Sequence, residues 1–107
     1  MIGPQPLSSQ AFHILVALAG GDLHGYGIMQ DVAARTAGKI QLSAGTLYGA
    51  IQRLLEQGFI MELPGGDERR RVYRLTAAGR KAARAEAARL AELLEQARQY
   101  GLAPGRS

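Results

Sequence analysis

Leu42-Ser43-Ala44-Gly45-Thr46-Leu47-Tyr48-Gly49-Ala50-Ile51-Gln52-Arg53-Leu54-Leu55-Glu56-Gln57-Gly58 is the stretch that decides the fold. Its larger apolar residues recur at i, i+4, i+7 and i+8, a spacing that places them on one buried stripe of a helix. They are Leu47, Ile51, Leu54 and Leu55. Ser43 is a good N-cap and Gly58 a stop signal, so the pattern predicts a helix between them.

The opposite face of this predicted helix is small and polar. It carries Gly45 and Gly49, and each glycine inside a helix costs about 1 kcal/mol relative to alanine. Their presence indicates that a partner approaches the backbone closely, and the major groove of DNA is the leading candidate. The other residues of this face are Thr46, Gln52 and Arg53, with Ala44 and Tyr48 toward its flank.

Composition limits the class of protein. The 107 residues are enough for one small domain, and 47% hydrophobic but only 6% aromatic content favours packed helices. The net charge of +4 favours an anionic partner. Without cysteine there is no disulfide or thiolate metal site, and the absence of a long apolar run predicts a cytoplasmic protein with no membrane partner. We expect His13 and His24 to be structural, and we expect no enzyme activity, cofactor or metal.

Flanking signals place the remaining elements. A staple of Leu7 and Phe12 around an N-cap predicts a first helix over about 9–18, and a second runs over about 25–36, with Gly38 as its stop. The alternation of residues 39–42 predicts a very short strand. Apolar runs at 59–63 and 69–75 around Pro-Gly-Gly-Asp predict a β-hairpin, and Thr76 caps a last helix to about residue 100.

Three helices, a hairpin and a last helix are the order of a winged helix-turn-helix domain, a mainly α fold with a small β-hairpin (α+β). We expect this DNA-binding domain over residues 1–75, a C-terminal dimerisation helix over 76–100 and a flexible tail over 101–107. In such a domain the third helix enters the major groove. Ser43, Thr46, Tyr48 and Gln52 lie where base or phosphate contacts are made. Alternatively, Ser43 is only a cap and Tyr48 packs against the hairpin.

A run of cations follows the hairpin turn. Between residues 69 and 84 there are seven basic residues and no acidic one. Arg69, Arg70 and Arg71 would lie near the hairpin tip, where they could contact the DNA backbone or form a solvated edge that prevents aggregation. Arg80, Lys81 and Arg84 suit a phosphate or the acidic groups of another subunit equally well.

The last helix carries an apolar stripe of Leu90, Leu93, Leu94 and Ala97. A domain this small has little surface of its own for such a stripe to cover. We therefore predict a two-fold homodimer whose recognition helices read two half-sites of double-stranded DNA. Packing of the stripe onto the first helix of the same chain is the alternative.

Four segments resemble the PadR family of transcriptional regulators. The resemblance implies a winged-helix repressor that dimerises through its C-terminal helix and responds to a small molecule such as a phenolic compound or a drug, which suggests a planar aromatic effector. Gly49 departs from the family, which usually has proline there, so the first turns of the recognition helix are less rigid. The segments are His24-Gly25-Tyr26-Gly27-Ile28, the stretch 42–48, 53–60 and 71–80.

The sequence thus predicts a DNA-binding transcriptional regulator, a homodimeric repressor. A winged-helix module that binds an acidic protein is the alternative. The predicted DNA contacts are Ser43, Ala44, Gly45, Thr46, Tyr48, Gly49, Gln52, Arg53, Arg69, Arg70, Arg71 and Tyr73, and the predicted dimer contacts are Leu90, Leu93, Leu94 and Ala97.

Overall fold

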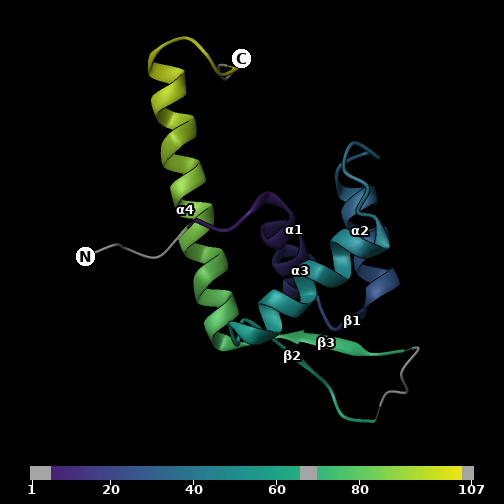
Figure 1. The fold of residues 1–107 in the computed structure, drawn as a ribbon. Coiled ribbons are helices and arrows are strands. Elements are labelled where there is room, and N and C mark those ends of the chain that lie inside the picture. Colours follow the sequence, from purple (N-terminus) through teal and green to yellow (C-terminus); the bar gives the residue numbers. More distant parts are fainter. Residues whose placement is uncertain (1–5, 66–69, 105–107) are drawn as a thin grey trace.

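The computed structural model describes residues 6–65 and 70–104. Within these ranges the chain forms a bundle of helices, a small antiparallel sheet at its base, and a long last helix at its side (Figure 1). This arrangement is a winged helix-turn-helix, and the predicted fold class is confirmed. The elements are α1 (Ser9–Ala19), β1 (Leu23–His24), α2 (Gly25–Arg35), α3 (Ala44–Glu56), β2 (Ile60–Glu62), β3 (Val72–Leu75) and α4 (Ala77–Gln99).

Three helix starts are fixed by a hydroxyl side chain, as predicted. At the start of α1 the N–H of Ala11 donates to Oγ of Ser8 at 3.1 Å, and equivalent bonds to Ser43 and Thr76 begin α3 and α4. Each bond satisfies one of the N–H groups that a helix leaves without a partner in its first turn. Gly58 follows α3 with φ of +76°, the left-handed conformation that ends helices.

The core lies between α1, α2 and α3 and is closed by the sheet. The buried stripe predicted for α3 is confirmed at three of its four positions, and Leu55 is half-buried. These side chains fix which face of α3 turns outward. The largest fully buried side chains are Ile14, Leu15, Ile28, Val32, Leu47 and Leu54.

The sheet has three strands, where the sequence predicts a hairpin alone. Its order is β1-β3-β2, so β3 is central and pairs with β1 through Leu23 opposite Tyr73 and His24 opposite Val72. On its other side β3 pairs with β2, with Ile60 opposite Leu75. The wing is therefore attached to the start of α2 as well as to the end of α3.

The very short strand predicted over residues 39–42 is wrong. That segment is a loop, because the N–H of Ile40 donates to Oγ1 of Thr36 at 3.0 Å and Nε2 of Gln41 donates to the carbonyl of Gly38 at 3.3 Å. Its polar and apolar alternation reflects the burial of Leu42 in the core rather than a ladder of strand hydrogen bonds.

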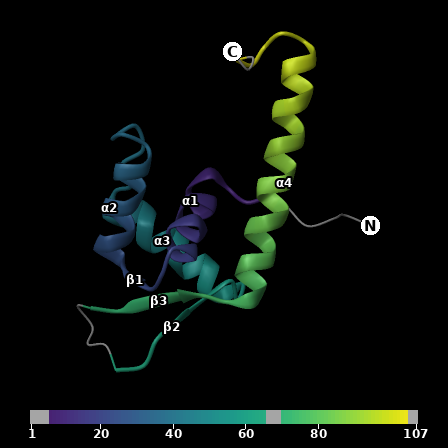
Figure 2. The same ribbon diagram turned by 180° about the vertical axis from the view of Figure 1, so that it is seen from behind.

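Helix α4 extends past the rest of the molecule. Its first half lies beside α1, and in both views its C-terminal half stands clear of the other helices (Figures 1 and 2). At its end the N–H of Leu102 donates to the carbonyl of Ala97 at 2.9 Å, so the tail predicted over 101–107 begins as an ordered cap. In the described part of the chain, no helix combines the length and apolar character needed to cross a membrane.

The segment before α1 is attached to α4 by a buried carboxylate. The side chain of Glu86 is 6% exposed and accepts from Nε of Arg89 at 2.9 Å. The hydrogen bond from Arg89 lowers the pKa of Glu86 most, the charge of Arg89 and the N–H of Leu7 lower it further, and burial opposes them. The carboxylate therefore stabilises the contact between the N-terminal segment and α4.

Glu86→Gln is expected to lower the free energy of unfolding near neutral pH. In this variant the free energy of unfolding should also fall less steeply as the pH is lowered. A carboxylate whose pKa is depressed in the folded state stabilises the fold above its ordinary value of 4.5, and this stability disappears as pH falls through the folded pKa. Urea unfolding across this range measures the effect. The exposed Glu92→Gln serves as the control, and a wild-type acid slope in Glu86→Gln would contradict the assignment.

Candidate nucleic-acid interface

The outward face of α3 is open at its N-terminal half. Ala44, Gly45 and Thr46 are exposed, and a Cβ built on Gly45 would meet no atom within 4 Å. The backbone here is accessible to a partner, since neither a side chain nor a neighbouring element covers it. Leu47 on the opposite face is fully buried, so the orientation of the open face is fixed by the core.

Ser43 acts as the cap of α3. Its Oγ accepts from the N–H of Thr46 at 3.2 Å and donates to Oγ1 of Thr46 at 3.0 Å. The capping role that the sequence left as an alternative is therefore present. Both hydroxyls remain exposed, which leaves lone pairs available at the end of the helix.

Farther along α3 the polar side chains lie along the helix surface. Nε2 of Gln52 donates to Oε1 of Glu56 at 3.3 Å. Nη1 of Arg53 lies 3.7 Å from the point that a Cβ on Gly49 would occupy. Gln52 and Arg53 are exposed, while Gly49 is half-buried. Both side chains are long enough to leave these weak contacts for an external partner.

Tyr48 packs across to α2. It is 51% exposed, and its hydroxyl end lies so close to Gly25 that a Cβ there would overlap it. Glycine is required at this position by the close approach of the ring. Together with Tyr73, Tyr48 lines a groove between α2, α3 and the wing, and its packing against the hairpin stays a prediction.

The wing brings some of the predicted cations together. Arg70 and Arg71 are exposed, and Nε of Arg71 lies 3.9 Å from Oε1 of Glu62, a loose ion pair between half-exposed groups. Arg69 lies outside the described residues. Arg74 instead binds Asp22 through two bonds of 2.8 and 3.1 Å, and this hydrogen bonding lowers the pKa of Asp22 although some desolvation opposes it.

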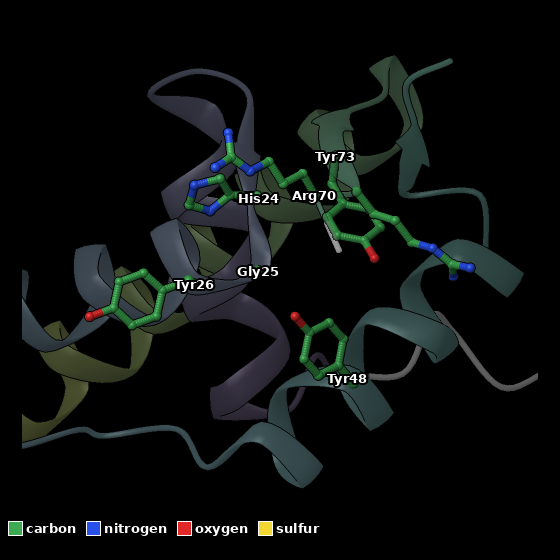
Figure 3. Close-up of a pocket in the computed structure, with 7 residues that line it drawn as sticks. His24, Gly25, Tyr26, Tyr48, Arg70 and Tyr73 are labelled. Carbon is green, nitrogen blue, oxygen red and sulfur yellow. The ribbon is translucent and has the colours of Figure 1, made fainter. Parts of the chain in front are cut away.

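Tyr73 is 3% exposed, so its ring belongs to the core. The predicted contact of Tyr73 with DNA stays a prediction. Its strand β3 is the central one of three and is paired on both edges near Tyr73. Only its hydroxyl reaches the groove beside Tyr48 (Figure 3). A two-stranded hairpin, as the sequence indicated, would have left the ring more accessible.

His24 has the structural role expected of it, in a form that the sequence did not specify. Its Nδ1 accepts from the N–H of Gly27 at 2.9 Å and caps α2. The same residue pairs with Val72 in the sheet. His24 therefore connects the wing to the first turn of α2. The sequence around it, His-Gly-Tyr-Gly, does not resemble a usual N-cap, so this role was not predicted.

The three cations at the start of α4 are exposed. None of the ion pairs found among the described residues involves Arg80, Lys81 or Arg84. They lie in the N-terminal half of α4, the helix that follows β3. Their position leaves open both readings, a phosphate or the acidic groups of a second subunit.

The apolar stripe of α4 is largely uncovered. Leu90, Leu93 and Leu94 are 40%, 47% and 43% exposed, and Ala97 is half-buried. Packing of α1 against the first half of α4 leaves these leucines without a cover in the single chain. They belong to the C-terminal half of α4, the part of the helix that stands clear of the others (Figure 2).

Comparison with known proteins gives a consistent family. The model described as the Transcriptional regulator PadR-like family matches residues 14–85, more than half of the chain. A transcriptional regulator from Clostridium thermocellum has a solved structure that is 27% identical with a TM-score of 0.74, covering 84% of this chain and 90% of that one. No curated protein matches the chain.

Two further solved structures share the fold. A PadR family transcription regulator from Clostridium difficile is 21% identical with a TM-score of 0.74, over 87% of this chain and 98% of that one. Bacillus subtilis PadR, solved in complex with operator DNA, is 21% identical with a TM-score of 0.63, over 72% of this chain and 45% of that one.

Proposed function

The chain belongs to the PadR-like family of transcriptional regulators and is not an enzyme, and from this premise we propose that it is a homodimeric repressor that binds specific DNA sequences. The N-terminal half of α3 enters the major groove. The wing contacts the sugar-phosphate backbone beside it. A second copy, bound through α4, addresses a two-fold related half-site.

The observation that carries the proposal is the open backbone of α3. A recognition helix must come close to the base edges, and bulky side chains at its leading turn would hold it away. Gly45 has open space around it although glycine destabilises an exposed helix, so its presence is accounted for by a partner. The small side chains of Ala44 and Thr46 continue the same surface.

The contacts divide by role. Thr46 and Gln52 are the side chains suited to base edges, because a hydroxyl can meet either kind of base and an amide pairs with adenine. Arg53, Arg70 and Arg71 suit phosphates, which fix the position of the protein without reading sequence.

The uncovered leucines of α4 support the homodimer. An exposed apolar face of this kind is characteristic of an interaction surface. A two-fold dimer buries the same stripe from both subunits and places two copies of α3 on one duplex. A Bacillus subtilis protein with this fold was solved in complex with operator DNA, which supports DNA as the partner here.

Release of DNA by a small molecule is part of the proposal, on the strength of the family. An apolar hollow of about 200 Å³ lies between Leu7, Phe59, Ala82 and Ala85. Sites for drug-sized ligands usually exceed about 300 Å³, so a planar aromatic molecule would need the partner subunit to complete this space. Loss of the protein–DNA complex on addition of such compounds, in the assay below, tests the effector.

The decisive experiment is a mobility-shift assay on the DNA upstream of the gene for this protein, repeated over a range of salt concentrations. We expect binding whose log K falls with log salt by about 0.9 for each phosphate neutralised. Selection from random duplexes then gives the preferred sequence. A complex insensitive to salt, or a selection that enriches no sequence, would instead favour binding of an acidic protein.

Two sets of variants separate the roles of the wing and of α3. Arg70→Ala with Arg71→Ala is expected to weaken all duplexes similarly and to reduce the salt slope by about two, because phosphate contacts carry no sequence information. Gln52→Ala is expected to change the ranking of duplexes by about 1–3 kcal/mol at one base pair. Arg98→Ala, at the far end of α4, is the charge control. Unchanged affinity in the Arg70/Arg71 double variant together with an unchanged ranking in Gln52→Ala would refute the assignment.

A further inference from the structure

A groove of about 460 Å³ lies between the N-terminal end of α2, the middle of α3 and β3. Tyr26 and Tyr48 are the exposed rings at its rim, and Gly25 lies between them (Figure 3). Arg70 and Arg71 of the wing complete its lining. The groove is more polar than a typical site for an apolar ligand, which directs attention to its donors.

One donor in the groove belongs to a side chain that is otherwise buried. Tyr73 is 3% exposed, no hydrogen bond of its hydroxyl is found among the described residues, and the hydroxyl is accessible from the groove rather than sealed in the core. The hydroxyl points into the space that it shares with the hydroxyl of Tyr48 (Figure 3). A phenol hydroxyl that meets solvent through this groove can donate to an acceptor that binds there.

The start of α2 adds a positive potential to the same space. The first N–H groups of a helix have no partner within it, and the helix dipole is positive at this end. His24 satisfies the N–H of Gly27, the third of these residues. Gly25 has no side chain to fill the groove, because the ring of Tyr48 occupies the Cβ position.

The charges around the groove are also mainly positive. Arg71 is held only loosely by Glu62, at 3.9 Å. Asp22 is already neutralised by two hydrogen bonds from Arg74. An anion in the groove therefore meets guanidinium groups, a phenol hydroxyl and a helix N-terminus.

We propose that this groove binds one phosphodiester group of the DNA backbone in each subunit, with the Tyr73 hydroxyl as a hydrogen-bond donor to it. This phosphate clamp rests on the proposed function and extends it, because it assigns α2 to the interface. The clamp lies beside α3, so a phosphate held there would fix the depth and angle at which α3 enters the groove of DNA.

The phenol of Tyr73 is in the protonated form that a hydrogen-bond donor requires. Burial raises the pKa of its phenol, and the charge of Glu62 and the nearby Tyr48 raise it further, while Arg71 opposes them. The hydroxyl therefore keeps its proton throughout the physiological range and can donate to an anion. A hydrogen bond to a charged acceptor is among the stronger ones, which sets the size of the expected effect.

Tyr73→Phe tests the clamp by deleting one oxygen. We expect DNA affinity to fall about tenfold, the equivalent of one hydrogen bond to a charged group. Thermal stability should stay the same or rise, because no hydrogen bond of the lost hydroxyl is found among the described residues. Tyr100→Phe removes a hydroxyl from an exposed tyrosine at the end of α4, and it should leave affinity unchanged.

The clamped phosphate can be located with DNA in which single phosphates are replaced by uncharged methylphosphonates. Duplexes of the selected sequence, each with a single methylphosphonate, are titrated with wild type and Tyr73→Phe. In wild type we expect neutralisation of the clamped phosphate to cost about tenfold, and in Tyr73→Phe the cost at that position should be smaller than in wild type, while the cost at the other positions stays the same. Such non-additivity marks two groups that contact each other.

The outcomes separate the clamp from the function on which it rests. If wild type binds DNA and Tyr73→Phe binds as tightly as Tyr100→Phe, the clamp is wrong and the proposed function stands. If Tyr73→Phe weakens binding equally at every methylphosphonate position, Tyr73 acts through the fold and the clamp is also wrong. If wild type binds no duplex at any salt concentration, both proposals are overturned.

Discussion

Leu93→Glu is expected to convert the protein to a monomer and to lower its affinity for a two-half-site operator by about 100-fold or more. A charge in the middle of the exposed leucine stripe would have to be buried without a partner in the proposed dimer. A monomer then binds one half-site alone and loses the gain from linked binding, which is commonly 100-fold or more. Sedimentation velocity and mobility shift measure the two effects.

The stripe can be tested against the rest of α4 with the same substitution. Ala88 is exposed on the opposite face of the helix, so Ala88→Glu introduces the same charge away from the stripe. It should leave both the dimer and the affinity unchanged. Because Leu93 is 47% exposed in the single chain, Leu93→Glu should not unfold the domain. A dimeric Leu93→Glu protein with wild-type affinity would place the interface elsewhere.

Gly79→Ala is expected to destabilise the fold by about 3 kcal/mol, a large part of the stability of a small domain. A Cβ at Gly79 would overlap the carbonyl oxygen of Phe59 and lie 2.8 Å from Cδ1 of Leu75. That carbonyl accepts from the N–H of Thr76 at 3.1 Å, so moving it breaks the bond that attaches the start of α4 to β2. Backbone cannot give way as a flexible side chain can. Urea unfolding measures the loss.

Gly45→Ala is the matched control for Gly79→Ala. The new methyl group meets nothing within 4 Å, so helix propensity dominates and stability should rise by about 0.5–1 kcal/mol. If Gly79→Ala unfolded at the same urea concentration as wild type, the close packing of α4 on Phe59 would not be a stabilising constraint.

The helices could be predicted because their signals are local. A cap such as Ser43 and a stop such as Gly58 lie within a few residues of the elements they bound, and the apolar period of α3 is decided by its own sequence. Predicted and observed ends differ by one or two residues. The half-burial of Leu55 reflects its place at the edge of the stripe.

The sheet was predicted less well, because its third strand is defined by pairing alone. Two residues, Leu23 and His24, have no periodicity of their own and become a strand only through β3. Residues 39–42 alternate between polar and apolar side chains more clearly than Leu23 and His24 do, but they have no strand to pair with. The burial of the Tyr73 ring follows from the same missed strand.

The groove could not have been predicted from the sequence. It brings together Tyr26 of α2, Tyr48 of α3 and Tyr73 of β3, and only the tertiary fold places these elements side by side. The sequence did identify Tyr48 and Tyr73 separately, as predicted DNA contacts. What it lacked was the contact of Tyr48 with Gly25, which assigns α2 to the same surface.

The pairing of β1 with β3 also sets the order in which the molecule can assemble. Asp22 and Arg74 join the same two segments at a separation of 52 residues, so this corner closes only after the intervening helices have brought its ends together. Contacts between such distant residues carry a high loop-closure cost and form late in folding. During synthesis α1, α2 and α3 can collapse as soon as they leave the ribosome, whereas the wing is completed only when residue 75 has followed them. The nascent chain therefore acquires its helical core before it acquires a finished wing.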